Sequence, residues 1–119
     1  GDMRRLNPCA KGRGGELKRQ LVRAALAAAA ALRAATPGVE IHAIDPIIHI
    51  HPRPGQDPGP IEAYNEVQWE SWDLLTGRLE PGLGGHPEAF DVMGVNYYWN
   101  NQWLDHAEPL SVFDAARFV

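Results

Sequence analysis

The sequence predicts an α/β fold in which parallel strands alternate with helices. An alanine-rich helical pattern follows the first fifteen residues, an apolar run suited to a strand comes next, and the same order then repeats once. Strands that alternate with helices pair in parallel through right-handed crossovers. With 119 residues, 45% of them hydrophobic, the chain has enough apolar sequence for a core.

The first predicted helix spans residues 16–36 and follows a glycine-rich loop at 1–15. Glu16 puts a negative charge in the first turn, which favours a helix, and Pro37 with Gly38 ends it. Apolar residues recur at steps of three and four, so they predict one buried stripe. The stripe consists of Leu17, Leu21, Ala25, Ala28, Leu32 and Ala35. The lysines and arginines of this helix fall outside it.

The first predicted strand covers residues 39–45, with an extended continuation toward His51 and then a proline-rich loop. A second helix is predicted at 60–77, because Pro60 suits the first helical position. The inner face of that helix is expected to hold Ile61, Tyr64, Gln68, Trp72 and Leu75.

The second predicted strand covers residues 90–98. Its centre is almost continuously apolar, so we expect both of its faces to be covered. Residues 99–119 are predicted as an aromatic-rich loop.

Two parallel strands cannot cover two apolar helix faces, and they leave open edges. The simplest resolution is a single domain of which residues 1–119 form a central segment, namely a partial (β/α)₈ barrel. Such a barrel takes about 250 residues. The isolated chain is therefore expected to self-associate or to form a molten species.

Composition excludes several other classes of protein. The net charge of −4 argues against a nucleic-acid partner. The apolar run at 24–35 is interrupted by Arg33 and is shorter than the roughly 20 residues of a membrane span. The single cysteine forms no internal disulfide, and no secretory pattern is recognised, so a cytoplasmic location is expected. The glycines at 12–15 lack the ending of a phosphate-binding loop, so no cofactor is predicted.

Polar and aromatic side chains follow the second strand, where parallel α/β folds carry their functional groups. These are Asn96, Tyr97, Tyr98, Trp99, Asn100, Asn101, Gln102 and Trp103. Amides and phenols both donate and accept hydrogen bonds, and indole rings offer flat apolar surface, so this set suits a polyol. The alternative is that the tryptophans only pack at a barrel end.

Residues 91–98, DVMGVNYY, resemble the sixth barrel strand of the family 1 glycoside hydrolases. Residues 100–103, NNQW, and 11–24, KGRGGELKRQLVRA, are similar to a bacterial β-glucosidase-like subgroup of that family. The resemblance covers about residues 7–110. It implies a retaining glycosidase that hydrolyses O-glycosidic bonds and takes a β-glycoside as its carbohydrate substrate.

The same resemblance implies roles for individual residues. Tyr98 would hydrogen-bond the nucleophilic glutamate, and Asn96 would lie near the acid/base group or the substrate. A phenol that donates to a carboxylate favours its ionised form. The family's acid/base Asn-Glu motif is missing from residues 1–15, and its nucleophile would fall after Val119. We therefore expect the chain alone to be inactive, while the parent protein is an enzyme.

The histidines His49 and His51 follow the first strand, and Asn101, Gln102 and Trp103 complete the predicted sugar-binding set. Imidazoles two residues apart could also hold a metal, but no third ligand is evident, so no metal site is predicted. Two further hypotheses stay open. One is a non-catalytic or degenerate carbohydrate-binding relative, and the other is a small histidine-based metal-binding module.

Overall fold

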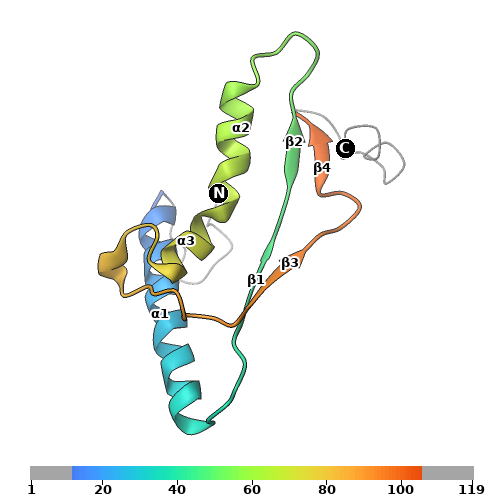
Figure 1. Ribbon diagram of the computed structural model, residues 1–119. Coiled ribbons are helices and arrows are strands. Elements are labelled where there is room, and N and C mark those ends of the chain that lie inside the picture. The colour runs from blue at the N-terminus through green and yellow to red at the C-terminus, as the bar shows by residue number, and fades with distance from the viewer. Residues whose placement is uncertain (1–11, 106–119) are drawn as a thin grey trace. The chain divides into compact units, whose positions relative to one another are not determined.

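A computed structural model describes residues 12–105 of the chain (Figure 1). It contains helices and parallel strands, so the chain is of the α/β class. The strands form two separate two-stranded sheets, β1 with β3 and β2 with β4, and neither sheet by itself defines a barrel. Parts of the loops predicted at 1–15 and 99–119 lie outside the described residues.

The described chain divides into two compact units. The first contains residues 12–43 and 71–92, and the second contains residues 44–70 and 93–105. The strands β1 (His42–Pro46) and β3 (Val92–Asn96) pass from the first unit into the second.

The helix α1 (Gly14–Ala35) begins two residues before the predicted start and buries a different stripe from the predicted one. Val22 and Ala29, two turns apart, are its buried residues, whereas Leu21 and Leu32 are 53% and 50% exposed. The predicted stripe is therefore wrong. The run of alanines is apolar on every side, so its periodicity could not select one face.

Two arginines of α1 form ion pairs on the buried side of the helix. Arg19 forms an ion pair with Glu80, with its Nε 2.7 Å from Oε2, and Arg33 lies 2.9 Å from the Asp91 carboxylate. Both arginines lie on the Val22–Ala29 side of the helix, at steps of three and four. These side chains, which the sequence pattern excluded from the buried stripe, thus flank it.

The helix predicted at 60–77 is broken into three pieces. They are α2 (Gly59–Glu66), the 3₁₀ turn η2 (Val67–Trp69) and α3 (Glu70–Thr76). Within the second unit, Gln68 Nε2 donates to the carbonyl of Asn65 at 2.6 Å and competes with the helical backbone bond at that carbonyl. Tyr64 is 59% exposed, so it does not belong to the buried face that the sequence predicted.

The core of the first unit lies around α3. Leu74 and Trp72 are buried, and the indole Nε1 of Trp72 donates to the carbonyl of Ala43 at 3.1 Å. After α3 the chain turns through Gly77, which has a φ of 74°, and the 3₁₀ turn η3 (Pro81–Leu83). Glu80 is the partner of Arg19. Among the described residues other than glycine, it is the one with a positive φ.

The strands β1 and β3 run parallel. Asp91 and Val92 donate to the carbonyl of Ile41 at one end, and Ile47 donates to the carbonyl of Asn96 at the other. A Cβ at Gly94 would lie 2.7 Å from Cγ1 of Ile44, so any other residue at position 94 would force the Ile44 side chain to shift.

Both faces of β3 carry exposed apolar side chains. Met93 and Val95 are 48% and 51% exposed, and Val92 is also exposed. The expectation that both faces are covered is therefore wrong for the described residues. A continuous apolar sequence is typical of a strand that is covered on both faces, and residues 12–105 do not cover both faces of β3.

The second sheet pairs β2 (His49–His51) with β4 (Gln102–Leu104) in parallel, and Figure 1 draws them as neighbouring arrows. The loop predicted from residue 99 is thus wrong at β4. Three residues are too short a run to predict as a strand, and the pairing with β2 defines it. Hydrogen bonds from His49 N to Asn101 O at 2.8 Å and from Asp105 N to His51 O at 2.9 Å bracket the ladder. Among the described residues, no helix is long and apolar enough to cross a membrane.

Candidate functional site

One face of the β2–β4 ladder gathers polar side chains that the sequence separates by about fifty residues. His49 pairs with Gln102 in the ladder register. His51 lies on the same face as His49, because side chains two residues apart in a strand point to the same side. The two imidazole rings meet edge to face, with centroids 4.4 Å apart.

Gln102 joins this histidine pair to a phenol. Its Oε1 lies 2.9 Å from Nε2 of His51, and its Nε2 donates to the hydroxyl of Tyr97. Since the amide oxygen can only accept, His51 Nε2 carries the proton in this bond. We call His49, His51, Gln102 and Tyr97 the polar array.

The two histidines of the array differ in exposure. His51 is 8% exposed, whereas His49 is open to solvent. Partial burial lowers the pKa of His49, and the neighbouring His51 lowers it further. The neutral form of His49, which has one donor and one acceptor nitrogen, therefore prevails at neutral pH.

Asn101 has a structural position. It is buried, and its Nδ2 donates to the carbonyl of Ile47 at 2.5 Å and to that of Asn96 at 3.3 Å. This amide ties the end of β3 to the segment that joins β1 to β2. The expected sugar contact from Asn101 is thus not favoured by the geometry, since its amide nitrogen already bonds two carbonyls.

Asn96 and Tyr98 lie at the end of β3, and both side chains are exposed. Tyr98 is 60% exposed, and its carbonyl accepts a hydrogen bond from the backbone N–H of Asn101 at 3.0 Å. The backbone here is fixed, while the phenol remains accessible. Such a side chain can receive a group from elsewhere without displacing a core contact.

Trp103 lies on the opposite face of the ladder from the polar array. It pairs with Ile50 in the register, and together with Ile61 and Tyr64 of α2 these residues line an open groove of about 530 Å³. The structure therefore divides the predicted sugar-binding set. It brings His49, His51 and Gln102 together and separates Trp103 from them.

The sequence analysis missed the role of Asn65. This buried residue of α2 accepts a hydrogen bond from Ile50 N and donates one to Ile50 O, both at 2.9 Å. Gln68 likewise accepts from Ile48 N at 2.9 Å. These amides cover the edge of β2 that does not face β4. A signal existed, because asparagine is unfavourable inside a helix unless its side chain has a partner.

Among residues 12–105, no group of three or more His, Cys, Asp or Glu side chains is placed to hold a metal ion. Searches against known protein families, curated proteins and solved structures find no match to this chain.

Proposed function

We propose that the chain is the central segment of a retaining glycoside hydrolase with a (β/α)₈ barrel, similar to the β-glucosidases of family 1. In this proposal it contributes sugar-binding groups, while other segments of the barrel carry the two catalytic carboxylates. The observation that carries the proposal is the polar array on one face of the β2–β4 ladder.

The chemistry of the array supports a polyol ligand. Imidazole, amide and phenol groups each donate and accept hydrogen bonds, as sugar hydroxyls do. His51, Gln102 and Tyr97 are held by bonds to one another, so their orientation is set before a ligand binds. The exposed His49 beside them offers the ligand a neutral ring with one donor and one acceptor.

The position of the array also supports the proposal. Tyr97 lies directly beyond the carboxyl end of β3, and β2 follows β1 along the chain. In barrels of parallel strands, substrates bind at the carboxyl ends of the strands. Asn96 and Tyr98 lie at the same end of β3, where the family resemblance assigns them to the reacting centre.

The exposed apolar surfaces support a larger parent fold. Met93 and Val95 are exposed on β3, and Leu21 and Leu32 are exposed on α1. A complete barrel would supply strands beside β3 and further elements against α1. The carboxylates would come from those other segments, one as general acid and base and the other as nucleophile.

The experiment uses the longer protein encoded by the reading frame that contains this segment, assayed with aryl β-glucosides. We expect hydrolysis with retention of the anomeric configuration. Proton NMR of the first product measures that configuration. Gln102→Ala should raise KM about tenfold, the effect of losing one or two hydrogen bonds. The control Arg78→Ala alters an exposed side chain that contacts Asp73 in the first unit, and it should leave KM unchanged.

Inversion of configuration, or no hydrolysis of any β-glycoside, would contradict the enzyme assignment.

One observation favours a second candidate, a non-catalytic carbohydrate-binding relative. Within the described part of the chain, the polar array contains no carboxylate. Binding of β-glucosides that is sensitive to Gln102→Ala, without any hydrolysis by the longer protein, would select this candidate.

A further inference from the structure

A groove lies on the opposite face of the β2–β4 ladder from the polar array. The groove between this face and α2 has a volume of about 530 Å³, within the range of small-molecule sites. Ile50 and Ile61 in its lining are buried. We propose that this groove binds a neutral pyranose sugar, with Tyr64 and Trp103 as its aromatic surfaces and Gln56 and Asp105 as its hydrogen-bonding end.

The aromatic residues give the first reason. Tyr64 is 59% exposed although it lies on the side of α2 that lines the groove, and Trp103 is half-buried in the same lining. Phenol and indole rings combine a flat apolar surface with a polar edge. The C–H face of a pyranose packs on such rings, while its hydroxyls stay available for hydrogen bonds.

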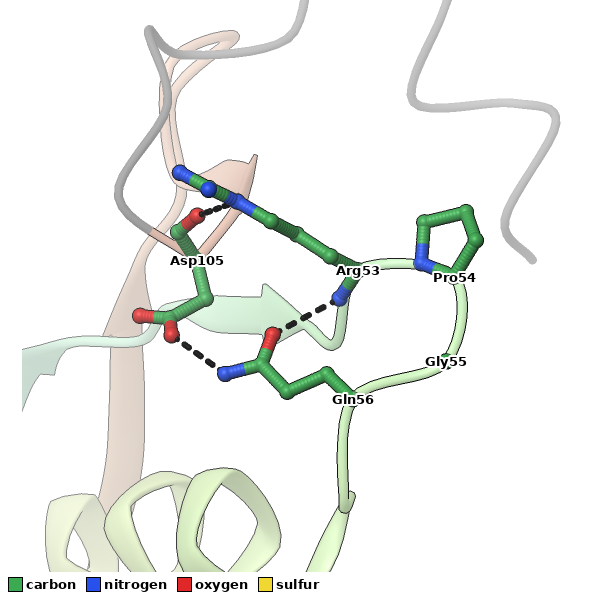
Figure 2. A pocket seen from close by; sticks show the side chains of 5 residues that line it. All are labelled: Arg53, Pro54, Gly55, Gln56 and Asp105. Atoms are coloured by element: carbon green, nitrogen blue, oxygen red, sulfur yellow. Dashed lines mark hydrogen bonds between the residues drawn. The ribbon is translucent and has the colours of Figure 1, made fainter.

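The polar end gives the second reason. Figure 2 shows the hydrogen bonds of Gln56 and Asp105, which also line the neighbouring pocket drawn there. Gln56 Nε2 donates to Oδ2 of Asp105 at 2.7 Å, and Gln56 Oε1 accepts from the backbone N–H of Arg53 at 2.9 Å. Arg53 Nε donates to the main-chain carbonyl of Asp105 at 2.7 Å. The carboxylate and the amide are thus held in place before any ligand binds, which lowers the entropy cost of binding.

The charge of the lining selects among ligands. Of the described residues that line this groove, Asp105 is the one with a formal charge. A sugar phosphate or a sugar acid would call for a cationic group in the groove, and the described lining residues include no lysine or arginine. A purely apolar ligand would cover Asp105 and Gln56 without hydrogen-bonding them, which is unfavourable. A neutral sugar satisfies both the rings and the polar end.

This site is separate from the polar array. Ile50 and Trp103 are register partners on one face of the ladder, whereas His49 and Gln102 are partners on the other. The groove proposal therefore does not depend on the proposed function.

The test uses the ¹⁵N-labelled 119-residue chain carrying Val95→Lys, a substitution on β3 outside the groove lining that opposes self-association. It titrates this chain with cellobiose and follows its amide and indole signals by NMR. We expect saturable shifts of the Trp103 indole and of the Asp105 amide. Tyr64→Ala should weaken binding about five- to tenfold through loss of one ring, and Asp105→Asn should also weaken it. The matched control is Val67→Ala, an exposed apolar residue in the turn after α2 that is outside the groove lining.

Three results would overturn the proposal. The first is the absence of a saturable Trp103 shift in the Val95→Lys chain, which overturns the proposal even if Tyr64→Ala fails to fold. The second is a set of shifts confined to His49, His51 and Gln102, which would assign the sugar to the polar array alone. The third is binding of glucose 6-phosphate that is as tight as that of cellobiose, or tighter. This result would contradict the preference of the groove for neutral sugars.

Discussion

The side-chain amide of Asn65 occupies the place of a neighbouring strand beside Ile50. Its Nδ2 donates to the Ile50 carbonyl and its Oδ1 accepts from the Ile50 N–H, both at 2.9 Å. An amide side chain carries one donor side and one acceptor side, as a peptide unit does. A helix residue therefore satisfies a strand edge that would otherwise be open.

Asn65→Ala should destabilise the chain by about 2–4 kcal/mol, because it leaves a buried N–H and a buried C=O without partners. Helix propensity alone predicts the opposite sign, since alanine is the best helix former. Urea unfolding gives the free energy, and hydrogen exchange of the Ile50 amide should become faster. The control Glu62→Ala changes an exposed residue of the same helix. An unchanged urea midpoint together with unchanged exchange at Ile50 would contradict this role.

The sequence predicted the α/β class and the order of helix and strand, because apolar periodicity and proline and glycine breaks are local signals. It failed on the buried face of α1, where Val22 and Ala29 lie under Arg19 and Arg33. On that side of α1 the two arginines pair with Glu80 and Asp91. A periodic pattern cannot predict such partners, which lie about sixty residues away.

For the candidate site, the sequence predicted His49, His51 and Gln102 as sugar-binding residues but could not assign them to a face of the sheet. Trp103 and Gln102 are adjacent in the chain, yet they point to opposite sides of β4. Assigning them required the presence and register of β4, a three-residue strand that is defined only by its pairing with β2.

Stability should depend on pH through Asp91. A hydrogen bond from the backbone N–H of Ile41 and a second from Arg33 lower the pKa of this carboxyl. A carboxyl whose pKa is lower in the folded state contributes stability above its unfolded value of about 3.9, and loses it as pH falls through the folded value. Asp91→Asn should therefore flatten the decline of the melting temperature below about pH 4. An equally steep decline in Asp91→Asn would contradict this assignment.

The exposed strand β3 should drive association of the isolated chain. Met93 and Val95 are exposed, and β3 pairs only with β1 within the described residues. We expect light scattering to give a mass above that of one chain, and Val95→Lys to lower it, because a charge on an open strand opposes pairing. Arg78→Lys, far from this strand in sequence, serves as the control. A monodisperse monomer with a sharp melt would count against the account.

Tyr98 should act on the chemical step in the complete enzyme. Under the proposed function, Tyr98→Phe lowers kcat more than it raises KM, because the phenol bonds the nucleophile and not chiefly the substrate. The 119-residue chain itself should not cleave aryl β-glycosides above background. An unchanged kcat in Tyr98→Phe would show that the phenol of Tyr98 does not take part in the chemical step.

We propose that this chain is one segment of a larger barrel. The most direct test is the mass of the native polypeptide, measured by immunoblot of cells that carry the gene with antibodies raised against residues 60–76. A complete barrel of about 250 residues predicts a band at about 27 kDa or more. A single band at 13.1 kDa, the mass of these 119 residues, would contradict the claim.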